Sequence, residues 1–144
     1  MPDSSSGPYV TVAALCEKTI EDKLGRLSLI NIVDQINISP PQGTPAPEQM
    51  PQVSIQLVVV VSLKAGILTG QQNLKLTVVR PEGERGPSVT TPVLFQGDER
   101  GTNLITNLGL QFEKEGLYWI DIEVADQLVS RIPLRVLYQR VVFG

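Results

Sequence analysis

Apolar residues recur at every second position along most of the chain. Two clear runs are Val53, Ile55, Leu57, Val59, Val61 and Leu63, and Tyr118, Ile120, Ile122 and Val124. A period of two is typical of half-buried β-strands, and the β-branched residues in these runs suit a pleated sheet. Segments rich in glycine, proline and charged residues separate the runs. The pattern predicts about eight strands, with a helical turn only at 17–24, where Gly25 would end it.

Short strands joined by regular turns predict an all-β fold, an immunoglobulin-like antiparallel β-sandwich of seven to nine strands. We expect residues 8–144 to form one domain and residues 1–7 to be a flexible segment. The sequence Gly116-Leu117-Tyr118 is similar to a tyrosine corner, in which the hydroxyl bonds to upstream backbone. Lys114 replaces the usual acidic residue, and no cysteine lies two positions after the tyrosine. These differences favour a sandwich that is not of the antibody type.

Several segments also carry a resemblance to a known family. They are YVTVAALCEK, LSLINIVDQI, PVLFQGDERG, GLYWIDIEV and RIPLRVLYQR. The chain resembles, over nearly everything after residue 8, a family of short uncharacterised bacterial proteins, a domain of unknown function. The resemblance implies an immunoglobulin-like sandwich. That family has no known activity or functional residues, so the resemblance implies no site.

The only tryptophan, Trp119, is expected on the polar face of its strand. If Tyr118 and Ile120 face the core, Trp119 shares the opposite face with Asp121. The following strand would place Arg131 and Arg135 on that same face. Two outcomes are open: Trp119 shields a loop or stacks on an arginine stem, or it anchors a partner, because tryptophan and arginine are common interface hot spots.

The turn between these two strands needs an odd-length loop or a bulge. Even-numbered residues face the core on both strands, and directly opposed residues must share a face. A three-residue loop would oppose Asp121 to Arg131 and Trp119 to Pro133. A five-residue loop would oppose Glu123 to Arg131 and Trp119 to Arg135.

Val58 and Val60 lie on the face that should meet solvent in a simple sandwich. We therefore expect something to cover them. One candidate is another segment of this chain, such as the proline-rich loop at 39–52 or the apolar tail at 141–143. The other candidate is a second subunit, which would use the strand edge near Val58 and Val60.

The sequence offers little catalytic chemistry. It has no histidine, which excludes Ser-His-Asp and Cys-His arrangements and makes a cysteine-histidine zinc site impossible. Cys16 is the only cysteine, and we expect it to be a small core residue. Asp34 is expected to be turned outward by a bulge. Acidic loop residues are interleaved with lysine and arginine, so no metal site is expected. We also expect no cofactor and no enzyme activity.

Composition and charge limit the partners further. Apolar residues make up 42% of the chain and charged residues 19%, and the net charge of −3 includes no basic cluster. Nucleic-acid binding is therefore not expected. The longest apolar run, 57–61, is too short to span a bilayer, and the polar start is unlike a signal peptide. We expect a cytoplasmic protein.

These features favour a noncatalytic intracellular protein-binding or assembly module, which could self-associate. Its candidate surfaces are the face with Trp119, Arg131 and Arg135, and the strand edge near Val58 and Val60. The alternative is a ligand-binding sandwich of the carbohydrate type. That alternative needs an aromatic platform, and four of the seven aromatic residues are expected inside.

Overall fold

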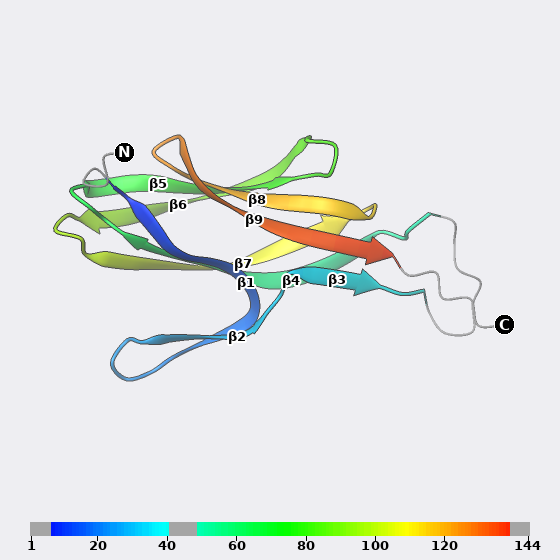
Figure 1. Cartoon of the computed structure of the whole chain (residues 1–144), viewed down its shortest axis with the longest axis horizontal. Coiled ribbons are helices and arrows are strands. Elements are labelled where there is room, and N and C mark those ends of the chain that lie inside the picture. The colour runs from blue at the N-terminus through cyan, green and yellow to red at the C-terminus, as the bar shows by residue number, and fades with distance from the viewer. Residues whose placement is uncertain (1–6, 41–48, 139–144) are drawn as a thin grey trace.

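The computed structural model describes residues 7–40 and 49–138, which form nine strands and no helix (Figure 1). The strands are β1 (Tyr9–Glu21), β2 (Leu27–Ile32), β3 (Gln35–Ile38), β4 (Val53–Lys64), β5 (Thr69–Val79), β6 (Arg85–Gln96), β7 (Gly101–Phe112), β8 (Gly116–Val124) and β9 (Gln127–Tyr138). The predicted helical turn is wrong. Residues 17–21 continue β1 because they pair with β2, and the turn begins at Asp22.

The strands form two sheets. The four-stranded sheet has the order β2-β1-β4-β7, and the five-stranded sheet has the order β3-β9-β8-β5-β6. All pairs are antiparallel except β3 with β9, which are parallel. The predicted all-β, immunoglobulin-like sandwich of seven to nine strands is confirmed, and the parallel pair departs from its antiparallel pattern.

The core lies between the two sheets and takes alternating side chains from every strand except β2. Its largest fully buried members are Phe95, Phe112, Leu15, Leu63, Leu74, Ile120, Ile122, Leu134, Val59, Val61 and Val136. The rings of Phe112 and Tyr118 meet edge to face, with centroids 4.9 Å apart. Burial of an apolar side chain of this size contributes about 1.5–3 kcal/mol, so the alternating pattern provides the main stabilisation of the sandwich.

The β8–β9 hairpin contains the predicted bulge. Its turn has only two residues, Ala125 and Asp126, with φ of 50° and 65°, as in the tight hairpin turns that follow sheet twist. One extra residue, Val129, then shifts the ladder between the Glu123 and Ile122 pairs. Beyond the bulge, Asp121 faces Arg131 and Trp119 faces Pro133. This is the register that a three-residue loop would have given.

A second bulge changes which residues of β1 face the core. The β1–β4 ladder shifts between Val10 and Val12, so the alternation reverses after Thr11. Leu15 enters the main core, whereas Val12 is 41% exposed. The apolar alternation of Val10, Val12 and Cys16 in the sequence predicts one shared face, and the bulge shows that this prediction is wrong. Cys16 is buried as predicted, but in the second apolar cluster.

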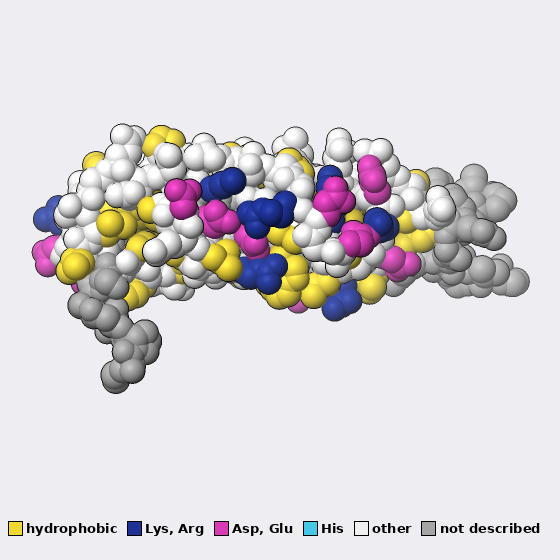
Figure 2. Space-filling view, turned by 90° about the horizontal axis from the view of Figure 1, so that it is seen from above, with side chains coloured by type: hydrophobic (Ala, Val, Ile, Leu, Met, Phe, Trp, Pro, Cys, Tyr) yellow, Lys and Arg dark blue, Asp and Glu magenta, His cyan; other side chains and the backbone are white. Residues whose placement is uncertain are grey.

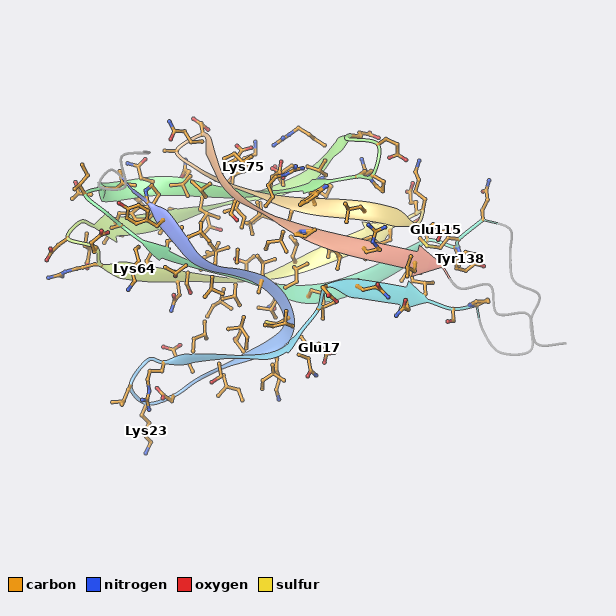
Figure 3. All side chains as sticks on the ribbon, in the orientation of Figure 1. Glu17, Lys23, Lys64, Lys75, Glu115 and Tyr138 are labelled. Atoms are coloured by element: carbon orange, nitrogen blue, oxygen red, sulfur yellow. The ribbon has the colours of Figure 1, made fainter. Side chains whose placement is uncertain are left out.

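The β1–β2 hairpin covers Val58 and Val60. β1 pairs with β4 only as far as Cys16, and after Cys16 it pairs only with β2. The hairpin leaves the sheet there and lies along the outer side of the four-stranded sheet (Figure 1). Cys16, Val58 and Val60 form a second apolar cluster, against which Leu27 and Leu29 of β2 pack. Side chains fill the space between hairpin and sheet (Figure 3).

This cover corrects one predicted partner surface. Val58 and Val60 are 9% and 0% exposed, and both pair with β1 on one side and β7 on the other. They are neither a strand edge nor available to a second subunit in this structure. The covering segment is part of the same chain, but it is the hairpin. The predicted tail at 141–143 and most of the predicted loop at 39–52 lie outside the described residues.

Other features locate the ends of the sandwich. β1 starts at one end of the long axis and β9 finishes at the other, where Tyr138 and Glu115 lie, far from Lys64 (Figure 3).

Asp34 is exposed, as expected, but it lies in the crossing from β2 to β3 and not in a bulge. The described residues include no helix that is long and apolar enough to cross a lipid bilayer.

Candidate protein-binding site

Trp119 lies on the outer face of the five-stranded sheet within a network of charged side chains. Arg131 Nε donates a hydrogen bond of 2.6 Å to Asp121 Oδ1. The same guanidinium lies 4.3 Å above the centre of the Trp119 ring. Arg85 lies 3.0 Å from Glu123 and 3.7 Å from Asp121. Figure 2 shows basic and acidic side chains interleaved over this side of the molecule.

This network divides the predicted trio of Trp119, Arg131 and Arg135. Trp119 is half-buried, and Arg131 is engaged by both Trp119 and Asp121. The expectation that Trp119 lies on the outer face is confirmed, and the stacking of its ring on an arginine is observed. Arg135 is exposed, and its side chain has no ion pair with any residue in 7–40 or 49–138. Of the three residues, Arg135 is therefore the one whose charge has no partner within the described part of the chain.

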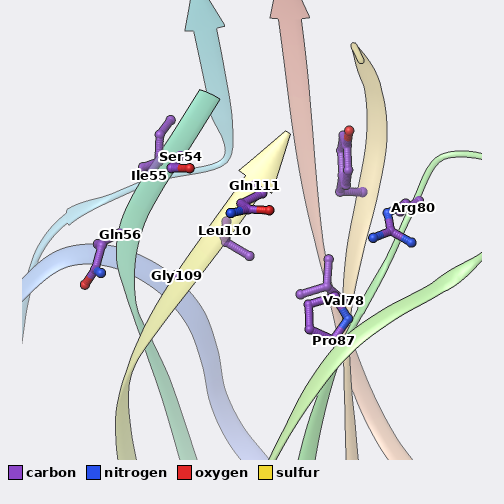
Figure 4. A pocket seen from close by; sticks show the side chains of 10 residues that line it. Ser54, Ile55, Gln56, Val78, Arg80, Pro87, Gly109, Leu110 and Gln111 are labelled. Carbon is purple, nitrogen blue, oxygen red and sulfur yellow. The ribbon is translucent and has the colours of Figure 1, made fainter. Parts of the chain in front are cut away.

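A cleft of about 470 Å³ opens between the two sheets at their β6–β7 side (Figure 4). Its apolar lining comes from all five strands β4 to β8, and comprises Ile55, Val78, Pro87, Leu110 and Tyr118. Polar side chains at its rim include Arg80 and Gln111. The lining contains no carboxylate and no thiol. The apolar part of the cleft can therefore accept an apolar side chain.

Tyr118 forms the wall of this cleft and the predicted tyrosine corner. Its hydroxyl donates a hydrogen bond of 2.7 Å to the carbonyl oxygen of Lys114. Burial raises the pKa of the Tyr118 phenol above its ordinary value, more than the contacts with Lys114 lower it. Tyr118 therefore stays neutral at physiological pH, where it holds the β7–β8 connection against the sheet.

β7 is an edge strand with none of the usual protection against pairing. Its twelve residues, GTNLITNLGLQF, contain no charged residue and no proline. All twelve pair with β4 in one register without a bulge. No described strand pairs with its other edge. Charged residues, prolines, bulges or short length normally protect such an edge from another chain, and β7 has none of these features.

The free hydrogen-bonding groups of β7 can be assigned from the ladder. Ala65 N donates a 3.0 Å bond to Arg100 O, one step beyond the Lys64–Gly101 pair. Antiparallel pairs alternate between bonded and non-bonded, so the even-numbered residues from Thr102 to Phe112 bond to β4. The odd-numbered residues point their N–H and C=O groups away from the sheet. They are Asn103, Ile105, Asn107, Gly109 and Gln111.

The other edges of the sandwich differ from β7. β6 contains Pro87 and Pro92 and a register shift opposite Thr77 and Val79, and prolines limit strand pairing. β3 has four residues and β2 has six, so both edges are short. The outer side of the β1–β2 hairpin exposes Ile20 and Ile32. The sequence shows that β7 lacks charged residues and proline, but it does not show that this strand lies at the edge of its sheet.

The described residues contain no group of three cysteine, histidine, aspartate or glutamate side chains placed to hold a metal ion. Two surfaces of the described residues are candidate binding sites. One is the β7 edge with the adjoining cleft, and the other is the outer face that bears Trp119 and Arg135.

Comparisons with solved structures give distant likenesses. An immunoglobulin-like protein from Pseudomonas aeruginosa shares 10% identity at a TM-score of 0.42, with 92% of this chain and 98% of that chain covered. The CARDB domain of a Pyrococcus furiosus protein, in complex with di-metal ions, shares 13% identity at a TM-score of 0.43. That match covers 95% of this chain and 99% of that domain.

A β-glucosidase from Listeria innocua, in complex with glucose, shares 12% identity at a TM-score of 0.47. The match covers 87% of this chain but only 16% of the glucosidase chain. No curated protein matches the sequence. A family profile does match, over residues 11–137: that of the family of unknown function DUF6941. This match spans most of the sandwich, and the chain therefore belongs to the DUF6941 family.

Proposed function

We propose that the chain is a noncatalytic intracellular protein-binding or assembly module, and that it binds by strand addition at the free edge of β7. The observation that carries this proposal is the composition of that edge: twelve paired residues without charge, proline or bulge. An added strand gains main-chain hydrogen bonds in register with the sheet. Each such bond contributes about 0.5–1.5 kcal/mol net, so several together support a specific complex.

The adjoining cleft supplies a second element of recognition. Its lining includes Gly109, Leu110 and Gln111 of β7 together with Pro87 of β6. A strand added along β7 passes the mouth of this cleft, where one of its side chains can enter. Main-chain bonds provide affinity in this mode, and side-chain pockets provide selectivity.

The outer face with Trp119 is a weaker candidate surface. Arg131 is already held by Asp121 at 2.6 Å and by the Trp119 ring, so a partner would have to compete with both contacts. A carbohydrate site is less favoured again, because Phe95, Phe112, Tyr118 and Tyr138 are buried and offer no exposed stacking platform.

Selection of displayed peptides on the purified chain tests the proposal. Asn107 has an outward N–H, so Asn107→Pro removes a donor from the free edge and none from the β4 ladder. Asn107→Ala changes the same side chain and keeps that donor. We expect selected peptides to bind the native chain and Asn107→Ala but not Asn107→Pro. N-methylation of alternate peptide residues should also abolish binding. Peptides that bind all three proteins equally would overturn the proposed mode.

A further inference from the structure

The β7 edge has the composition of a surface that pairs with itself. We propose that its partner is a second copy of this chain, whose β7 adds antiparallel to form one continuous eight-stranded sheet. This inference rests on the proposed strand addition. The two-fold axis passes through Asn107, so that outward-bonding residues face each other in pairs. Asn107 meets its own copy, Ile105 meets Gly109, and Asn103 meets Gln111.

The side chains in this register are complementary to their own copies. Asn103, Asn107 and Gln111 end in amides, and each amide is both a donor and an acceptor. Every amide therefore faces another amide across the axis. No charged residue occurs in β7, so the pairing brings no like charges together. Like charges directly opposite in a ladder are destabilising. In a symmetric interface such a repulsion would occur on both sides of the axis.

Gly109 supports the same arrangement. Its φ lies outside the positive range, and a Cβ added to it would meet nothing nearer than Gln56 Nε2 at 3.9 Å. The fold of the single chain therefore does not require a glycine there, although glycine weakens a strand. A glycine inside a strand often marks the close approach of another backbone. Opposite Gly109, the copy places Ile105, which is 43% exposed in the single chain.

The amide of Asn103 already accepts a 2.7 Å hydrogen bond from the Ser62 hydroxyl. Its NH₂ group remains available to the Gln111 amide of the copy. Within one chain, Asn103 and Gln111 are eight positions apart on β7, a separation of about 27 Å at the usual rise per residue. Each therefore interacts across the axis without contacting the other within its own chain. This separation makes the register testable with charges.

Sedimentation analysis and light scattering over a concentration series measure the assembly. Two double variants add charges at the same two positions: Asn103→Lys with Gln111→Lys, and Asn103→Glu with Gln111→Glu. Each alone should be monomeric, because the axis opposes like charges, and an equal mixture of the two should form a mixed dimer. A third variant, Asn103→Lys with Gln111→Glu, opposes unlike charges and should remain dimeric. Circular dichroism and thermal unfolding confirm that every variant is folded.

The Asn107 pair of variants completes the test. We expect Asn107→Ala to dimerise like the native chain, and Asn107→Pro to raise the dimer dissociation constant by about tenfold or more, equivalent to about 1.4 kcal/mol. A native chain that stays monomeric at high micromolar concentration overturns self-pairing. Strand addition survives that result if displayed peptides still distinguish Asn107→Pro from Asn107→Ala. A native dimer that tolerates both Asn107→Pro and the like-charge variants overturns the use of β7 itself.

Discussion

Arg131 lies directly opposite Asp121 in the β8–β9 ladder and donates to it a hydrogen bond of 2.6 Å. The Asp121 carboxylate is nearly buried, with a side chain 8% exposed, whereas the Arg131 side chain is 40% exposed. This asymmetry matters because a buried charge that loses its partner is costly, while an exposed charge remains hydrated. The contacts of Arg131 and Arg85 therefore stabilise the nearly buried carboxylate of Asp121.

Arg131→Met should lower the free energy of unfolding by about 1–3 kcal/mol, since it leaves Asp121 with only the longer contact to Arg85. The matched control is Arg135→Met on the same strand, which should change stability by less than about 0.5 kcal/mol because that side chain is exposed. Urea unfolding, followed by the fluorescence of Trp119, measures both. Equal losses for the two variants would contradict this role of Arg131.

Thr77, which lies beside the same network, has a buried polar group without the kind of partner that Asp121 has. It is 2% exposed, pairs with Asp121, and its hydroxyl has no hydrogen-bond partner among the described residues. Thr77→Val replaces that hydroxyl with a methyl group and should raise the free energy of unfolding by about 1 kcal/mol. Thr77→Ser keeps the hydroxyl and loses the methyl group, so it should be destabilising. A loss of stability in Thr77→Val would show that the hydroxyl has a partner.

Tyr118 predicts the response to alkaline pH. Burial raises the pKa of its phenol above the ordinary 10.0 in the folded state, so the unfolded state loses this proton first. The stability linked to Tyr118 is fully present below pH 10.0 and falls as the pH rises through and beyond it. Tyr118→Phe should be about 1 kcal/mol less stable at neutral pH, because it lacks the hydrogen bond to Lys114.

The alkaline loss of stability should be shallower in Tyr118→Phe than in the native chain. Urea unfolding at several pH values, from neutral to above 10.0, gives this comparison. Both proteins keep Lys114, so the difference between their pH profiles isolates the phenol. Parallel profiles for the two proteins would refute the raised pKa of Tyr118.

Cys16 reports whether the β1–β2 hairpin opens. Its thiol is 0% exposed beneath the hairpin, and burial raises its pKa. Since the thiolate is the reactive form, modification should require opening. Leu29→Ala removes a contact of the hairpin with the covered cluster and should accelerate thiol labelling by about tenfold, for a loss of about 1.4 kcal/mol in the free energy of opening.

The control for this experiment is Leu24→Ala at the tip of the hairpin, where Leu24 is 77% exposed. Its labelling rate should match that of the native chain. If Leu29→Ala labels no faster than Leu24→Ala, the hairpin does not control access to the thiol.

The sequence was most informative where a strand alternates without interruption. The faces of β8 and β9 and the need for a bulge between them follow from the parity of their apolar residues. The hydroxyl contact of Tyr118 follows from the tyrosine-corner motif around it. The apolar residues on both faces of β4 also indicated that Val58 and Val60 are covered. Such patterns respond to local burial, which each strand carries in its own residues.

Contacts between distant segments could not be predicted in this way. The extra residue in β1 near Thr11 reverses its alternation, and a single inserted residue leaves no mark in the residue types. The parallel pairing of β3 with β9 and the fold of the β1–β2 hairpin over Val60 depend on where the chain turns in space. The free edge of β7 depends on sheet order, which alternation does not encode.

The placement of β1 and β9 determines how the chain responds to mechanical load. Tension applied at Tyr9 and Tyr138 acts along the strands, because β1 starts and β9 finishes at opposite ends of the long axis (Figure 1). The hydrogen bonds of β1 with β4, and of β9 with its two neighbours, are then strained together in shear and not opened one after another.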